Sequence, residues 1–284
     1  MRVRKSVVII GAFLLTLFLL SVFVTLVQKD VGLKDRIALV RIEGPLVDGK
    51  AAIDEIKEYV KDKSIKAIVV RINSPGGGVV PSQEIHDEIK KAVQTKKVVV
   101  SMGSVAASGG YYISAPASRI IANPGTITGS IGVIMQIPNL KGLFEKLGVK
   151  ADVVKSGKHK EMASIFRGIG DEERKIVQGV MDDVHEQFIV AVAEGRKMPV
   201  ETVRELADGR IYSGNQARQI GLVDELGDLE YAVSVTAKMV GIKGEPEIVT
   251  KKEKNALMEI LRGEIPEGFL KYAPNLELKY QYMP

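Results

Sequence analysis

Two glycine-rich stretches, each preceded by a strand-like run of apolar residues, constrain the fold of this chain more than any other feature. The sequence NSPGGG at 73–78 follows Ile65–Ile72, and SVAASGGYY at 104–112 follows Val98–Met102. A strand that leads into a glycine turn is typical of α/β folds, which keep their sites at the carboxyl ends of parallel strands. The pattern therefore predicts two neighbouring strand ends with exposed backbone N–H groups between them.

Strand and helix patterns alternate along most of the chain. Besides the two runs above, strands are predicted at 37–42, 119–122, 131–136 and 151–154, with a turn at 123–130. Helices are predicted at 51–60, 82–93, 139–147, 171–194, 200–207, 215–221 and 230–240, and one more begins in the second glycine stretch and ends at Ala115. This alternation indicates parallel βαβ units with right-handed crossovers, and so an α/β fold with a parallel sheet.

The N-terminal segment is apolar enough to predict a membrane anchor. Val7–Val27 contains no charged side chain, and as a helix it would be about 32 Å long, enough to cross the hydrocarbon core of a bilayer. Three basic side chains among residues 1–6 favour a cytoplasmic N-terminus. A cleavable signal peptide is the alternative, but it should have a shorter apolar core and a small-x-small site. The sequence LVQKD at 26–30 contains no such site, so we expect an uncleaved anchor at 7–27 and a domain outside the cytoplasm.

Composition narrows the remaining possibilities. With 45% hydrophobic and 26% charged residues, the chain after the anchor fits one domain, predicted at 37–250 between a linker at 28–36 and a peripheral tail at 251–284. Cysteine is absent, which excludes disulfides, a thiol nucleophile and a cysteine-based zinc site. The net charge is only +5, and acidic residues lie near most lysines, so we expect no nucleic-acid partner.

Ser108 lies just before Gly109 and Gly110 in the second glycine stretch. A hydroxyl surrounded by backbone amides predicts a nucleophile beside an oxyanion hole. The alternative is structural, because glycine turns after strands often serve only tight packing or a left-handed backbone.

A serine nucleophile needs a base, and the chain offers two kinds. Its three histidines are at positions 86, 159 and 185. His86 and His185 are predicted to be exposed on helices, and no histidine has an obvious carboxylate to orient it, so a Ser-His-Asp triad has no support from spacing. A lysine base is the other possibility, with candidates at positions 155, 158 and 160, where like charges would lower the pKa. A solvated basic loop is the alternative, and these patterns do not choose among the three lysines.

Five segments in order carry a more specific signal. They are NSPGGG at 73–78, MGSVAASGGYYISA at 102–115, TGSIG at 128–132, SGKHKE at 156–161 and DGRIYSGNQARQIGLVDELG at 208–227. Together they resemble signal peptide peptidase A in its short bacterial and archaeal form, from about Ile37 to Val240. The resemblance implies a ClpP/crotonase-like fold of stacked ββα units and a membrane-anchored serine endopeptidase with a Ser-Lys dyad.

The resemblance also implies roles for individual residues. Ser108 matches the nucleophile, Lys160 the general base and Ser130 the residue that orients the base, while the amides of Gly77 and Gly109 match the oxyanion hole. It implies no metal or other cofactor. The implied substrates are cleaved signal peptides and other unfolded apolar segments. The implied assembly is a homo-oligomer, an octamer, in which serine and lysine meet across a subunit boundary.

Three other functions remain open. A related Ser-Lys protease that works with a stomatin-like membrane protein would share the fold and the chemistry but act on other substrates. A crotonase-like acyl-CoA enzyme would share an oxyanion hole of two amides and would need neither Ser108 nor a distant lysine. A membrane scaffold that has lost its activity would keep only the fold.

Overall fold

The computed structural model describes residues 14–21, 35–251 and 279–281. The chain divides into two units, Met1–Asp35 and Arg36–Pro284.

In the first unit, residues 14–21 form a helix. The rest of the predicted anchor at 7–27 lies outside the described residues, as does most of the linker predicted at 28–36. Among the residues that the structure describes, no helix combines the length and the apolar character needed to cross a bilayer.

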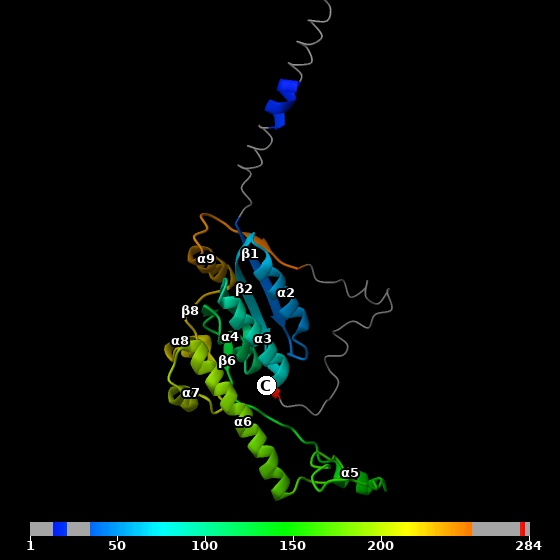
Figure 1. Ribbon diagram of the computed structural model, residues 1–284. Coiled ribbons are helices and arrows are strands. Elements are labelled where there is room, and N and C mark those ends of the chain that lie inside the picture. Colours follow the sequence, from blue (N-terminus) through cyan, green and yellow to red (C-terminus); the bar gives the residue numbers. More distant parts are fainter. Residues whose placement is uncertain (1–13, 22–34, 252–278, 282–284) are drawn as a thin grey trace, which may run out of the picture. The chain divides into compact units, whose positions relative to one another are not determined.

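The second unit is built on one mostly parallel sheet (Figure 1). Its strands are β1 (Arg36–Glu43), β2 (Ile65–Ser74), β4 (Lys97–Ala107), β5 (Arg119–Ala122), β6 (Ile127–Gly129), β7 (Ile211–Ser213), β8 (Glu225–Leu226) and β9 (Glu247–Val249). The order is β7-β6-β4-β2-β1-β9, and β5 pairs with both β4 and β8. Among the described strands of this sheet, only β6 and β7 pair antiparallel. A separate two-stranded sheet pairs β3 (Gly76–Gly78) antiparallel with β10 (Lys279–Gln281). The predicted α/β class with a parallel sheet is confirmed.

Helices cover both faces of this sheet. The helices of this unit are α2 (Lys50–Lys61), α3 (Val79–Val93), α4 (Gly109–Ser114), α5 (Lys141–Lys146), α6 (Asp171–Arg196), α7 (Val200–Leu206), α8 (Gly214–Gln219) and α9 (Leu229–Met239). Strand β1 shows the two faces directly. Val40 and Ile42 belong to the large core shared with α2, α3, α4 and α6, whereas Ile37 and Leu39 pack with Ala237 of α9. Neither face of the central strands β1, β2 and β4 meets water, so these three strands are largely continuous apolar runs, as is typical of parallel sheets.

Two predicted strands are wrong. Residues 131–136 contain only an isolated bridge, and the strand β6 lies instead inside the predicted turn at 123–130. The reason is that β4 continues to Ala107, past its pairing with β5, and offers a free edge on which β6 forms. Residues 151–154 form no strand because no neighbouring strand pairs with them, and they are exposed.

The helix predicted to begin in the second glycine stretch is confirmed as α4, which begins at Gly109. The first part of that stretch belongs to β4, which continues to Ala107. The hydroxyls of Thr126 and Thr128 donate to the carbonyls of Gly103 and Ala106 at 2.8 and 2.7 Å, so the extended part of β4 is tied to β6.

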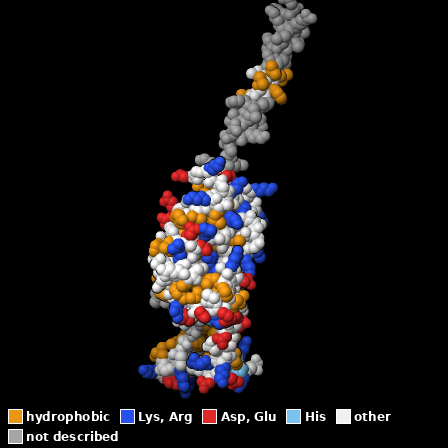
Figure 2. Space-filling view, turned by 90° about the vertical axis from the view of Figure 1, so that its left-hand side faces the viewer, with side chains coloured by type: hydrophobic (Ala, Val, Ile, Leu, Met, Phe, Trp, Pro, Cys, Tyr) orange, Lys and Arg blue, Asp and Glu red, His pale blue; other side chains and the backbone are white. Residues whose placement is uncertain are grey.

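Residues 137–170, here called the arm, precede α6 and contain α5. Figure 1 shows the arm at the N-terminal end of α6, away from the sheet. Four apolar residues at steps of four form a stripe along α6, and the stripe divides accordingly. Val184 and Phe188 are buried, whereas Ile176 and Val180 are 38% and 45% exposed. Hydrophobic side chains are visible on the surface of the region that joins the arm to the rest of the unit (Figure 2). The outer half of α6 and the arm therefore lack the core that covers the inner half.

Candidate active site

The carboxyl ends of β4 and β6 place Ser108 and Ser130 side by side. In this parallel pair Ala107 lies opposite Gly129, so the two serines are the next residues in register. The Ser108 N–H donates to the Gly129 carbonyl at 2.7 Å. Paired strands lie about 4.8 Å apart, so the two residues that sequence reasoning singled out in separate motifs are backbone neighbours.

Both serines have an unusual backbone. Their φ angles are 54° at Ser108 and 50° at Ser130, and Lys197 is the one other non-glycine residue with positive φ in the described ranges. This conformation costs a non-glycine residue on the order of 1–3 kcal/mol and persists where the surroundings fix it, often at functional sites. Ser108 lies on a sharp turn from a strand into a helix, and its hydroxyl does not cap α4. The residue is buried, with 1% of its surface exposed.

The two predicted oxyanion glycines lie on different elements, Gly109 in α4 directly after Ser108 and Gly77 in β3. Gly109 is the first residue of α4, where a helix leaves its N–H groups without intrahelical acceptors. Gly77 lies in β3 (Gly76–Gly78), and a Cβ there would come within 2.2 Å of the Leu46 carbonyl oxygen. Only glycine allows this approach of the two backbones.

The orientation of the Gly77 amide follows from its neighbours. The Leu46 N–H donates to the Gly76 carbonyl at 2.9 Å, and the Gly78 N–H donates to the Leu46 carbonyl at 2.8 Å. Successive peptide groups of a strand point to opposite edges. The N–H and C=O of Gly77 therefore face the edge of β3 away from Leu46.

A pocket of about 290 Å³ opens beside Ser108 and Ser130. Its other walls are residues 132–134, residues 207–209 and four residues of α6, namely Gln178, Met181, Asp182 and His185. These four follow the i, i+3, i+4, i+7 spacing of one helical face. The sequence analysis predicted the helix but did not single out these residues; their helical periodicity could have indicated a polar face beside the apolar stripe.

The predicted exposure of two histidines is wrong. His185 is half-buried in the pocket wall, and its Nε2 is buried without a hydrogen-bond partner in the described part of the chain. His86 is only 4% exposed and packs against the ring of Tyr112. Burial lowers the pKa of His86, although Asp87 opposes this effect.

A short loop holds Ser130 from the other side. The Ser130 N–H donates to the Arg210 carbonyl at 2.8 Å, and the Gly209 N–H donates to the Ile131 carbonyl at 3.1 Å. Hydrogen bonds from the Arg210 side chain, followed by its backbone N–H, lower the pKa of Asp208 to about 2. One wall of the pocket is therefore an ionised carboxylate that is paired with a guanidinium group.

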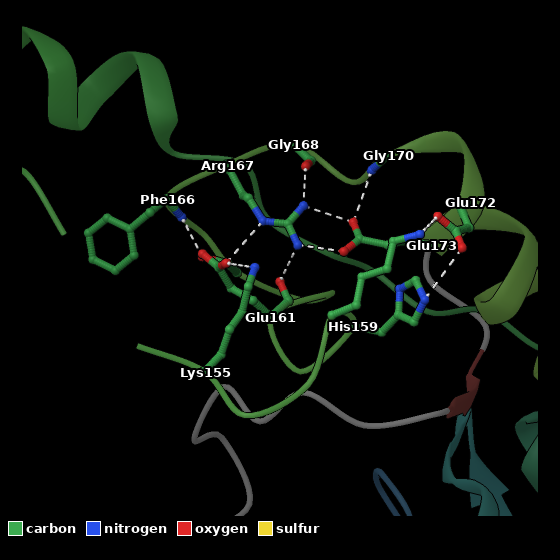
Figure 3. Close-up of polar contacts among 11 residues, drawn as sticks. Lys155, His159, Glu161, Phe166, Arg167, Gly168, Gly170, Glu172 and Glu173 are labelled. Carbon is green, nitrogen blue, oxygen red and sulfur yellow. Dashed lines mark hydrogen bonds and ion pairs between the residues drawn. The ribbon is translucent and has the colours of Figure 1, made fainter. Parts of the chain in front are cut away.

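Lys160 lies in the arm, in a loop that a network of polar contacts ties to the start of α6 (Figure 3). Arg167 donates to the two carboxylate oxygens of Glu173 at 2.8 and 2.5 Å and to the Glu161 carbonyl at 3.0 Å. The hydrogen bonds from Arg167 lower the pKa of Glu173 to about 2. Since Glu173 lies in the first turn of α6, this contact fixes the loop on the helix.

The three lysines of this loop differ in their partners. Lys155 Nζ lies 2.9 Å from the Glu161 carboxylate, and Lys158 Nζ lies 2.5 Å from that of Glu172. Lys160 forms neither an ion pair nor a side-chain hydrogen bond with the residues that the structure describes. Because carboxylates hold the ammonium groups of Lys155 and Lys158, Lys160 is the lysine whose side chain can reach another group.

The structure does not bring Lys160 to Ser108 within one chain. Lys160 is exposed, and no residue of the arm lines the pocket beside the serines. Within the described ranges, no group of three or more His, Asp and Glu side chains is arranged to hold a metal ion.

Two family models match this chain. The model of peptidase family S49 matches residues 90–243, which include Ser108, Ser130 and Lys160. The model of Clp protease matches residues 45–125, which include the two glycine stretches.

Individual relatives agree with these models. A protein of Synechocystis, provisionally named as a protease, is 43% identical over 233 residues, which cover 81% of this chain and 84% of the relative. A protein of Enterococcus faecium, provisionally named signal peptide peptidase SppA, is 43% identical over 66% of this chain and 54% of the relative. The chloroplastic serine protease SPPA of Arabidopsis thaliana is 32% identical over 82% of this chain and 37% of the relative. The last two relatives are thus considerably longer than the segment they share with this chain.

Proposed function

This chain belongs to peptidase family S49 as a serine protease of the signal peptide peptidase A type with a Clp-protease-like fold, and from that premise we propose that Ser108 and Lys160 form its catalytic dyad. The observation that carries the proposal is the pair of serines at adjoining strand ends. Ser108 and Ser130 are in register, and both have positive φ. Such a strained pair beside a pocket is what a fixed nucleophile and an orienting hydroxyl need.

The reaction is an acyl transfer. Neutral Lys160 accepts the proton of Ser108, whose Oγ attacks a peptide carbonyl carbon. The amides of Gly77 and Gly109 donate to the oxygen as it becomes negative, and removal of one such donor typically costs about 3 kcal/mol of transition-state stabilisation. Lys160 then protonates the leaving amine, and water hydrolyses the ester on Ser108.

The lysine comes from a second copy of the chain. This part of the proposal rests on the exposed, unpaired Lys160 in the arm and on a pocket beside Ser108 that no residue of its own arm lines. Apolar side chains on the arm and outer α6 lie uncovered, among them Val154, which is fully exposed, and Leu147 at 65%. Another copy that covers this surface would bury them and seat Lys160 beside Ser130. The resulting homo-oligomer is a ring, and we propose an octamer.

The substrates are cleaved signal peptides and other unfolded apolar segments. This assignment follows the name of the Enterococcus relative and the apolar N-terminal sequence at 7–27, which we propose as a membrane anchor. The N-terminus would be cytoplasmic and the protease domain extracytoplasmic. A signal peptide left in the bilayer would then be near the enzyme.

His185 is a second candidate for the base. Its ring lines the pocket that contains Ser108, and its Nε2 has no hydrogen-bond partner among the described residues. A histidine base would act within one chain and would make the assembly unnecessary for catalysis.

Four variants test the proposal on an unfolded apolar peptide. Ser108→Ala and Lys160→Ala should each lower kcat by at least about a thousandfold, with folding unchanged. The matched control is Lys155→Ala, which removes a neighbouring lysine of the same loop and should retain most of the activity. A base that must lose its proton before it acts gives a rate that rises toward alkaline pH. His185→Gln should leave this rise in place. Retained activity in Lys160→Ala, together with its loss in His185→Gln, would contradict the dyad and support the histidine.

The other functions make different predictions. Thioester turnover that survives Ser108→Ala would indicate an acyl-CoA enzyme. Failure of a serine-directed electrophile to label Ser108 in the assembled protein would indicate a scaffold. Capture of a stomatin-like protein, rather than signal peptides, on the Lys160→Ala variant would indicate the related membrane protease.

A further inference from the structure

The pocket beside Ser108 contains two carboxylates, and only one of them has a cation as partner. Asp182 and Asp208 both line the pocket. Arg210 forms an ion pair with Asp208, whereas no cation in the described part of the chain pairs with Asp182. With the ring of His185 neutral, the pocket therefore has a net negative charge that comes from Asp182.

The other groups of the pocket suit an aliphatic chain that ends in hydrogen-bond donors. Val133, Ile134 and Met181 provide apolar walls. Gln178 Nε2 donates to Asp182 Oδ1 at 2.7 Å, so the second oxygen of Asp182 and the side-chain carbonyl of Gln178 remain as acceptors. Lysine and arginine side chains have an apolar stem and a charged head that only donates. The pocket complements both parts of such a side chain.

The proposed substrates contain basic side chains next to apolar ones. A signal peptide has a positively charged region directly before its apolar core. The N-terminus of this chain has the same order, with three basic residues among positions 1–6 and the apolar run at 7–27. A basic side chain at such a border could enter the pocket while the apolar run lies along the enzyme.

We propose that this pocket is a subsite for a lysine or arginine side chain of the substrate, and that Asp182 is the residue that determines this specificity. The proposal rests on the proposed function, because it takes Ser108 as the nucleophile next to the subsite. It also names a narrower substrate class than apolar segments in general. Cleavage falls close to a basic residue that borders an apolar run, rather than at any point within the run.

Peptides that differ in one residue test this preference. Lysine or glutamine replaces each position in turn of an unfolded apolar peptide, and cleavage is measured at about pH 8, where an ordinary histidine is neutral. At the position that enters the pocket, kcat/KM should be roughly two- to fivefold higher for lysine, the effect of an exposed ion pair. This ratio should fall toward one in Asp182→Asn, and in the original protein when salt is added. Asp182→Lys should favour glutamate at the same position.

The matched control is Asp183→Asn. Asp183 is also exposed and also accepts a hydrogen bond from a glutamine, Gln187, at 2.8 Å, but it does not line the pocket. This variant should keep the lysine-to-glutamine ratio of the original protein. An equal ratio in Asp182→Asn and Asp183→Asn would overturn the proposal.

Two further measurements separate the subsite from the proposed function. Fluorescent forms of the same peptides should bind Ser108→Ala with a similar preference for lysine, which should disappear when Asp182→Asn is added. Such binding without any cleavage by the original protein would mean that the protease function fails and the subsite stands, whereas cleavage without a lysine preference would overturn the subsite alone. In sedimentation, Asp182→Asn should assemble like the original protein. A loss of assembly would indicate that a second copy occupies the pocket, and would also overturn the proposal.

Discussion

The sheet edge that holds Ser108 and the arm that holds Lys160 are built on different principles. Around Ser108 the backbone has little conformational freedom. It is held by backbone hydrogen bonds, by two serines with positive φ and by close contacts at glycine. Around Lys160, the loop is held by ion pairs such as Arg167 with Glu173, and its apolar side chains are exposed. The proposed nucleophile is therefore positioned by contacts within one chain, whereas the proposed base lies on an exposed surface that we propose a second copy covers. Changes to the arm should alter activity through assembly, and changes to the sheet edge should alter it through folding.

The largest effect is expected from a charge on the uncovered surface of the arm. Val154→Asp places a carboxylate where a second copy is proposed to pack, so it should abolish both assembly and proteolysis. The melting temperature should stay within a few degrees of the original, because Val154 has no core contacts to lose. Sedimentation and peptide cleavage measure the two outcomes. Ile248→Asp, an exposed position on β9 of the sheet, is the control and should assemble; full activity in Val154→Asp would refute the role of the arm.

A smaller loss is expected when the loop around Lys160 is released from α6. Arg167→Ala removes both hydrogen bonds to Glu173, so we expect at least about a tenfold fall in kcat/KM and faster proteolysis of the arm in limited digestion. Arg204→Ala, which breaks the exposed pair with Glu186 nearer the other end of α6, should change neither. Equal digestion of the two variants would mean that Arg167 does not order the loop.

The sheet edge should respond in the opposite way, with stability rather than assembly at risk. In Gly77→Ala the new methyl group would lie 2.2 Å from the Leu46 carbonyl oxygen, and we expect a loss of about 3 kcal/mol in the free energy of unfolding. The matched change on the arm is Gly142→Ala in α5, where no atom lies within 4 Å, and it should be neutral or slightly stabilising. Denaturant unfolding compares the two, and similar stabilities would contradict the close packing of β3.

Acid should weaken the two regions at different pH, with the smallest effects of the series. Burial lowers the pKa of His86 in the folded state. The unfolded state then binds the proton first, and stability falls as the pH drops below about 6.5. The pKa of Glu173 is lowered to about 2, so its contribution is complete above about 4.5 and is lost as the pH falls toward 2.

Thermal unfolding at a series of pH values, combined with digestion of the arm, separates these two effects. His86→Gln should flatten the stability profile between pH 7 and the folded-state pKa and leave the arm unchanged. Glu173→Gln should increase digestion of the arm at neutral pH and leave the profile above pH 5 unchanged. As the pH is lowered, thermal stability should fall before digestion of the arm increases. The reverse order would contradict this prediction.

How much of this arrangement the sequence could predict depends on where the determining contacts lie. The strands β1, β2 and β4 are buried on both faces, so their apolar runs identify them, and the two glycine stretches indicate the sheet edge. The strand β6 could not be predicted from its own residues, since it depends on the extra length of β4 and on the hydroxyls of Thr126 and Thr128. A pattern read along the chain does not contain such contacts between distant segments.

The same limit applies to the candidate site. Motifs pointed to Ser108 and Ser130, and the structure adds that they are neighbours in register. Two other features depend on how distant segments pack together. They are the pocket wall that α6 contributes, which contains His185, and the pairing of β10 with β3. The unpaired state of Lys160 could not be read from three similar lysines, because it depends on which of them meets Glu161 and Glu172.

The most direct test of the central claim is complementation between two inactive proteins. Ser108→Ala supplies Lys160 but no nucleophile, and Lys160→Ala supplies Ser108 but no base. If the dyad forms between copies, dissociating, mixing and reassembling the two should restore activity to about a quarter of the original, because random neighbours in a ring pair correctly at that frequency. If serine and base belong to the same chain, the mixture should stay as inactive as its components.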